Sequence, residues 1–99
     1  MATALKLVTI VAEEAVAARL IADIGRLGAT GYTATEARGE GSRGKRVGRV
    51  GEVNLRIETV VSPAVSAAIL ALLADRYFPH HATIAWVSDV EVVRGEKYI

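Results

Sequence analysis

Glycine and basic side chains are concentrated in one short segment of the chain, residues 39–51. Five glycines and four Arg or Lys residues fall within this range. Successive glycines let backbone N–H groups turn toward an anion, and Arg and Lys supply the opposing charge, so the composition favours a phosphate-binding surface. An ordinary solvated loop has a similar composition and stays open as the alternative. The segment leads into a strand pattern and not into a helix N-terminus, so it is neither a P-loop nor a dinucleotide fingerprint.

No other group of residues indicates a catalytic or metal site. The chain has no cysteine, which excludes disulfides, thiolate metal sites and a cysteine nucleophile. His80 and His81 are adjacent in a turn, with no carboxylate spaced to help them, so we interpret them as solvated or as facing a neighbouring subunit. Glu13 and Glu14 lie in the first turn of a helix pattern, where carboxylates stabilise the helix dipole. We therefore expect no catalytic residue, no bound metal and no enzymatic activity.

Hydrophobic periodicity predicts the elements that position these residues. Alternating or β-branched apolar runs predict strands over residues 5–11, 32–38, 52–61 and 83–87, with a short further segment at 90–93. Apolar stripes with helical spacing predict one helix that begins at Glu13 and stops at Gly28. A second helix is predicted to begin at Ser62-Pro63 and to end at residues 77–79. The glycine-rich segment then connects two strands.

The order βαββαβ with a short appended C-terminal strand predicts an α+β, ferredoxin-like sandwich with both helices on one sheet face. A chain of 99 residues has room for a single domain, residues 1–99. Apolar residues also occur on the second sheet face, to which we assign Val8 and Ile10, so we expect sheets of different subunits to associate. Tyr77, Phe78 and Trp86 are predicted to pack in the core or at an interface.

Composition limits the partners and the compartment. Apolar-class residues make up 52% of the chain, and the formal net charge is only +1, so the chain should fold and has no general bias toward nucleic acid. The predicted third strand carries none of the aromatic residues with which RNA-recognition modules stack bases. The N-terminus shows no basic segment ahead of an apolar stretch, and the longest mostly apolar run, 64–74, is too short to span a bilayer. We expect a cytoplasmic protein that binds no nucleic acid.

Four segments of the sequence resemble the PII signal-transduction proteins. Residues 31–41, GYTATEARGEG, are similar to the family's segment that leads into its T-loop, Gly-x-Thr-x-Thr-Glu-x-Lys/Arg-Gly-x-Gly. Residues 57–63, IETVVSP, resemble the family's third strand and the start of its second helix, and residues 93–96, VRGE, resemble a shortened C-terminal Arg-Thr-Gly-Glu. Residues 41–46, GSRGKR, resemble in particular the SbtB-like, carboxysome-associated branch.

The resemblance implies a homotrimer with an adenine nucleotide in each cleft between neighbouring subunits and a T-loop over about residues 39–51. The positions that match those around the adenine and ribose are Gly31, Tyr32, Thr33, Glu58 and Val60. The positions that match those at the phosphates are Gly39, Gly41, Ser42, Arg43, Arg46 and the C-terminal Arg94. Arginine suits a phosphate site because its planar guanidinium can donate to two phosphate oxygens at once.

One departure from the family concerns the ligand. The family's B-loop carries Gly-Asp-Gly-Lys, whereas residues 79–82 of this chain are Pro-His-His-Ala. Without that glycine and lysine, we expect ADP or AMP to bind at least as well as ATP. Bicarbonate is a candidate second ligand, because an anion beside the nucleotide phosphates would be neutralised by Lys45, Arg46 or Arg56.

We therefore hypothesise a regulatory protein whose T-loop signals energy and inorganic-carbon status to a membrane transporter or another target. The alternative is a CutA-like trimer, an interaction or metal-tolerance protein that shares the fold. Such a protein would not need the glycines and arginines of residues 39–46. Binding of an adenine nucleotide separates the two hypotheses.

Overall fold

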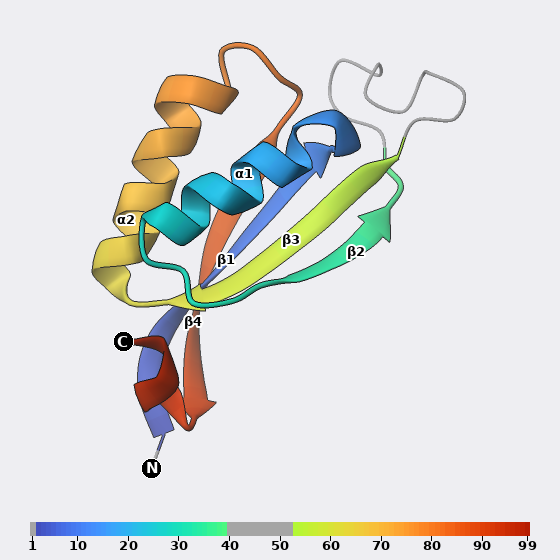
Figure 1. The fold of residues 1–99 in the computed structure, drawn as a ribbon. Helices are drawn as coiled ribbons and strands as arrows, with labels where there is room; N and C mark the ends of the chain where they lie inside the picture. The colour runs from blue at the N-terminus through green and yellow to red at the C-terminus, as the bar shows by residue number, and fades with distance from the viewer. Residues whose placement is uncertain (1, 40–52) are drawn as a thin grey trace.

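The computed structural model describes residues 2–39 and 53–99, in which one sheet and two main helices are formed (Figure 1). The strands are β1 (Ala2–Glu13), β2 (Thr33–Ala37), β3 (Asn54–Val61) and β4 (Ile84–Val93). Helix α1 (Glu14–Arg26) follows β1, and α2 (Pro63–Leu72) follows β3 and continues into a π-helical turn, η1 (Leu73–Tyr77). A 3-10 helix, η2 (Gly95–Tyr98), follows β4. Among the helices of these two ranges, none combines the length and the hydrophobicity that a membrane span requires.

The sheet has the order β2-β3-β1-β4, and each strand is antiparallel to its neighbours. The strands β2 and β3, which the glycine-rich segment was predicted to connect, pair with each other. Each main helix connects two strands that are not neighbours in the sheet. Figure 1 shows α1 and α2 on the same side of the sheet. The α+β, ferredoxin-like arrangement expected from the sequence is therefore confirmed.

The hydrophobic core lies between the sheet and the helices. The strand side chains that contribute to it are Val8, Ile10, Ala12, Ile57 and Val61. The helical side chains that contribute are Val16, Ala17, Leu20, Ile24, Ile69, Leu73 and Tyr77. The assignment of Val8 and Ile10 to the uncovered sheet face is wrong, because both are fully buried under the helices and the uncovered face of β1 presents Leu7, Thr9 and Val11.

The helix ends follow the local signals in the sequence. The Ser62 hydroxyl accepts the Val65 N–H at 3.2 Å and caps α2, which begins with Pro63. Gly28 has a φ of +120°, which glycine adopts without strain, and it directs the chain away from α1. Glu13 is the N-cap of α1 and not a member of its first turn; its carboxylate accepts the Ala82 N–H at 3.2 Å.

The predicted separate strand at 90–93 is wrong, because β4 runs without a break from Ile84 to Val93. It pairs with β1 along its whole length, from Val11↔Ile84 to Ala2↔Val93. The polar residues that suggested a break are accommodated in the ladder, where Asp89 forms an ion pair with Lys6 on the adjacent strand. The lower halves of β1 and β4 extend past the helices as a two-stranded ribbon that carries η2 and both termini (Figure 1).

Candidate functional site

Three of the residues expected around the adenine and ribose, Thr33, Glu58 and Val60, lie on the uncovered face of the sheet. One row across the four strands there consists of Thr33, Glu58, Thr9 and Trp86. Thr9 Oγ1 donates to Glu58 Oε2 at 3.3 Å, which orients the carboxylate within the row. Val60 lies two residues beyond Glu58 on β3 and is half-buried on the same face. The strand register thus brings together residues that are more than twenty positions apart in the sequence.

The segment that enters β2 is fixed to the same place. Thr59 Oγ1 donates to the Gly31 carbonyl at 2.6 Å, so the chain at Gly31 lies directly beside β3. Tyr32 follows with 53% of its surface exposed, and Thr33 then pairs with Glu58. The structure therefore gathers Gly31, Tyr32, Thr33, Glu58 and Val60 into one patch, which we call the β2–β3 patch.

The candidate bicarbonate residue Arg56 lies in the next row of the uncovered face. That row consists of Thr35, Arg56, Val11 and Ile84. The guanidinium of Arg56 lies 3.5 Å from Glu58 Oε2, and its central carbon is 5.7 Å from the centre of the Trp86 ring. The sequence analysis missed this contact with Trp86, because it depends on the pairing of β4 with β1 and not on local spacing.

The residues expected at the phosphates are only partly described. Gly39 lies two residues past the end of β2, at the opposite end of that strand from the β2–β3 patch. Five predicted site residues lie outside the described residues: Gly41, Ser42, Arg43, Lys45 and Arg46. For these positions the prediction stands as it was made from the sequence.

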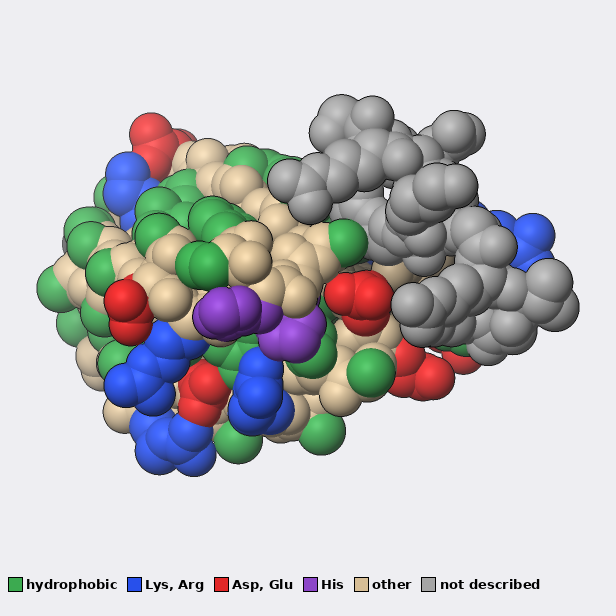
Figure 2. Space-filling model, turned by 90° about the horizontal axis from the view of Figure 1, so that it is seen from above, with side chains coloured by type: hydrophobic (Ala, Val, Ile, Leu, Met, Phe, Trp, Pro, Cys, Tyr) green, Lys and Arg blue, Asp and Glu red, His purple; other side chains and the backbone are tan. Residues whose placement is uncertain are grey.

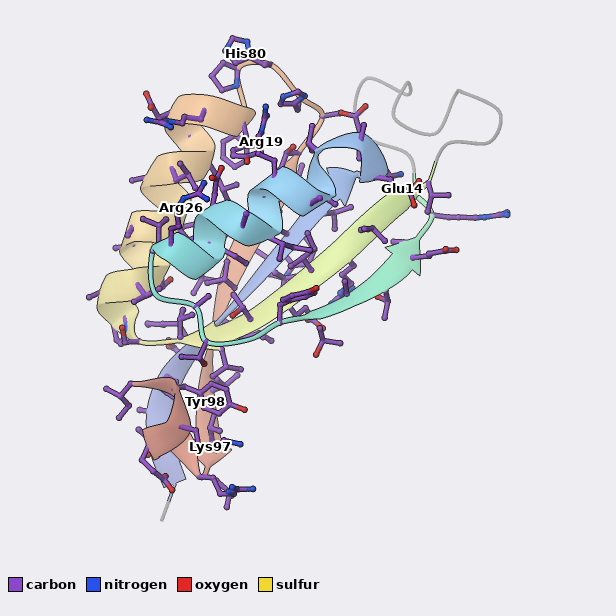
Figure 3. All side chains as sticks on the ribbon, viewed as in Figure 1. Glu14, Arg19, Arg26, His80, Lys97 and Tyr98 are labelled. Atoms are coloured by element: carbon purple, nitrogen blue, oxygen red, sulfur yellow. The ribbon has the colours of Figure 1, made fainter. Side chains whose placement is uncertain are left out.

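Arg94 lies far from the other predicted site residues of the same chain. It follows the end of β4, whose last residue pairs with Ala2, whereas β2 ends beside Asn54, which pairs with Glu13. The whole length of β1 lies between these two points, which separates them by roughly 35 Å at about 3.4 Å per residue. Figure 3 shows the same separation, with Lys97 and Tyr98 of the C-terminal segment at one end of the molecule and Glu14 at the other. One chain therefore does not place Arg94 beside Gly39.

A second polar cluster, which the sequence analysis did not predict, lies between α1 and the end of η1. The Tyr77 ring is buried, and its hydroxyl donates to Asp23 Oδ2 at 2.6 Å. The Arg19 Nε donates to the same hydroxyl at 3.3 Å, and the Arg19 Nη2 lies 3.2 Å from Nε2 of His81. Arg26 forms an ion pair with Asp23. The helical spacing of Arg19, Asp23 and Arg26 was the only signal in the sequence, and it does not reveal their partners.

The chain matches the family model "Nitrogen regulatory protein P-II" over residues 5–97. No curated protein matches it. A PII-like signalling protein of Thermus thermophilus is 52% identical, with 99% of this chain and 98% of that chain aligned and a TM-score of 0.84. CPII of Thiomonas intermedia, solved with ADP and bicarbonate, is 25% identical, with 100% and 98% aligned and a TM-score of 0.88. A Bacillus subtilis GlnK–ATP complex shares the fold at 20% identity, with 91% and 84% aligned and a TM-score of 0.66. The chain therefore belongs to the P-II family of regulatory proteins.

Proposed function

We propose that this protein binds an adenine nucleotide, ADP or AMP with ATP as a further candidate, in clefts between the subunits of a homotrimer. The β2–β3 patch of one subunit holds the base and ribose. The phosphates meet the base of the T-loop, residues 39–51, and Arg94 of a neighbouring subunit. The state of the ligand is passed through the T-loop to a target, for which a membrane transporter is our first candidate. We place the protein in the SbtB-like, carboxysome-associated branch.

The observation that carries this proposal is that one chain places the predicted site residues in two separate groups. The register brings Gly31, Thr33 and Glu58 together in the row that contains Thr9. Arg94 follows the residue that pairs with Ala2, so it lies about seven residues along β1 from that row, which is roughly 24 Å at about 3.4 Å per residue. A nucleotide is shorter than this distance. A single site that uses both groups of residues therefore requires two subunits, and a closed ring of three supplies three equivalent clefts.

The uncovered sheet face is suited to form the subunit contact. It exposes 41% of Trp86 and 46% of Ile84, and the half-buried Leu7 and Val11 lie between these residues and β3. An apolar sheet face of this kind is stabilised when it is covered. Three of its polar members, Thr9, Glu58 and Arg56, already have partners within the chain, so covering the face does not leave them unpaired.

The proposed ligands are supported by the relative from Thiomonas intermedia, which was solved with ADP and bicarbonate and also with ADP, AMP and bicarbonate. In this chain, Arg56 is the described candidate for bicarbonate. Its guanidinium is already held by Glu58 and by the Trp86 ring, so it offers a positioned and not a mobile cation. Lys45 and Arg46 remain candidates from the sequence. A triphosphate is expected to gain little over a diphosphate, because residues 79–82 lack glycine and lysine.

Complementation between two variants tests the shared site. Glu58→Ala and Arg94→Ala should each weaken ADP binding about tenfold or more, since each removes a charge-assisted contact. When the two variants are unfolded together in equal amounts and refolded, about one quarter of the sites in random trimers regain both native residues. Isothermal titration should then recover a population with native affinity. Lys97→Ala, a matched basic residue near Arg94, should bind ADP as the native protein does.

Each failure of this experiment has a distinct meaning. Mixed trimers confirmed by native mass spectrometry that regain no native sites would place the whole site within one chain, contrary to the proposal. A native trimer without affinity for ADP, AMP or ATP at millimolar concentration would instead leave the CutA-like alternative. Hydrogen exchange over residues 39–51, with and without ADP, tests the signalling step, for which we expect slower exchange in the presence of ligand.

A further inference from the structure

A hollow of about 590 Å³ lies on the helical side of the molecule, away from the uncovered sheet face. Its wall comes from α1, from η1 and from the turn that follows η1. The basic and imidazole side chains that line it are Arg19, Arg26, Arg76, His80 and His81. Figure 2 shows the two histidines beside a group of basic side chains that surrounds an acidic one, and Figure 3 shows Arg19, Arg26 and His80 along this side of the molecule.

The floor of the hollow is fixed by buried contacts. Tyr77 is only 1% exposed, and its hydroxyl joins Asp23 on one side to Arg19 on the other. The Asp23 side chain is 13% exposed, is paired with the cationic Arg26 and accepts a hydrogen bond from the Tyr77 hydroxyl. This carboxylate therefore opposes an incoming anion only weakly. The central carbon of Arg19 also lies 5.0 Å from the centre of the Tyr77 ring, so its guanidinium is held in place.

The contact between Arg19 and His81 marks the place where a ligand would bind. A guanidinium has donors and no acceptor, so a hydrogen bond in this contact needs Nε2 of His81 to accept. An oxyanion placed between the two side chains accepts from Arg19, and it also accepts from His81 when the ring carries a proton on Nε2. The direct contact uses one donor of Arg19 and leaves other guanidinium donors for such a ligand.

The remaining charges set the class of ligand. Arg76 has 71% of its side chain exposed, and its Nε lies 3.6 Å from the Asp75 carboxylate, which is 78% exposed and can turn into solvent. With Asp75 turned away, Arg19 and Arg76 present two positive charges to a ligand, and the two histidines add donors. We propose that this hollow binds a small divalent oxyanion of the sulfate or phosphate type, at a site separate from the nucleotide site.

The test is a titration of the full-length protein with sulfate, followed by backbone and arginine side-chain NMR at constant ionic strength. Sulfate is chosen because it stays divalent as the pH changes. We expect saturable shifts confined to residues 19–26 and 75–82, and weaker binding of chloride. Arg76→Gln should raise the dissociation constant about tenfold, because it removes a charged donor. Asp75→Asn should lower the dissociation constant about twofold to threefold, because it removes the exposed carboxylate. In a titration with inorganic phosphate, the dissociation constants of the variants should follow the same order as with sulfate.

The controls separate this site from nonspecific attraction and from the nucleotide site. Lys97→Gln removes one positive charge at the other end of the molecule and should leave sulfate binding unchanged (Figure 3). Arg76 and Asp75 are both exposed, so neither substitution should disturb folding. Saturating ADP should not displace sulfate. Equal effects of Arg76→Gln and Lys97→Gln, unsaturable shifts, or displacement of sulfate by ADP would each overturn the proposal.

Discussion

The hydroxyl of Tyr77 should contribute measurably to stability, and Tyr77→Phe removes it alone. The ring is fully buried and its packing is retained in phenylalanine, as is its contact with Arg19. The substitution deletes the 2.6 Å hydrogen bond to Asp23 and the 3.3 Å hydrogen bond from Arg19. Hydrogen bonds to charged groups contribute about 1.5–3 kcal/mol, and the lost phenol no longer has to be desolvated, so we expect a loss of about 1–2 kcal/mol.

Urea unfolding followed by far-ultraviolet circular dichroism measures this loss. Protein concentration must be held constant, because the stability of an oligomer depends on it. Tyr32→Phe is the matched control: Tyr32 is 53% exposed, and its substitution should change the free energy of unfolding by less than about 0.5 kcal/mol. Combined with Asp23→Asn, Tyr77→Phe should cost less than it does alone, by about 1 kcal/mol. Equal stability of the two Tyr→Phe variants would refute the role assigned to the buried hydroxyl.

Three further substitutions test the fold by the same unfolding assay. Ser62→Ala should cost about 1 kcal/mol by removing the cap of α2, whereas Ser62→Asp retains an acceptor and should cost little. Gly95→Ala should cost about 1–3 kcal/mol, because the added Cβ would lie 2.3 Å from the Thr3 Cβ, and Thr3→Gly should restore part of the loss. Thr83→Val should be neutral or stabilising by up to about 1 kcal/mol, since the buried Thr83 hydroxyl has no partner among the described residues; a clear loss would show that it has one.

The sequence predicted the architecture because local signals agree with tertiary contacts over most of the chain. Val16, Leu20 and Ile24 repeat with helical spacing, and all three are buried in the core. Ile57, Thr59 and Val61 are buried on β3 and alternate with the less buried Glu58 and Val60. In these segments, the local spacing of the apolar residues agrees with the positions that are buried in the core.

Prediction from the sequence failed where pairing with a distant segment overrides a local pattern. Ser88 and Asp89 interrupt an apolar run and suggest a break, but pairing with β1 continues through both residues. Similarly, the second helix widens at its end into a π-helical turn, in which the Phe78 N–H donates to the Leu73 carbonyl at 2.9 Å. Neither feature has a signature in residue spacing alone.

The candidate site was predicted through family resemblance, and the structure explains why spacing could not have supplied it. Glu58 and Thr33 lie on different strands, and only the register of β2 against β3 makes them neighbours. The network of Arg19, Asp23 and Tyr77 joins two helical segments and depends on the rotation of each one. Periodicity gives the face on which a residue lies, but it does not give the residue that faces it across an interface.

The start of α1 connects the two surfaces to which we assign binding. The Glu14 N–H donates to the Val53 carbonyl at 2.9 Å, which ties α1 to a residue that closely follows the predicted T-loop. The adjacent Glu13 carboxylate accepts the Ala82 N–H, so the turn that carries His81 is tied to the same point. Helix α1 then carries Arg19 into the helical-side hollow. Three separate segments therefore meet at Glu13 and Glu14 through hydrogen bonds, and a displacement of the chain at Val53 would either break its bond to α1 or move the start of the helix with it.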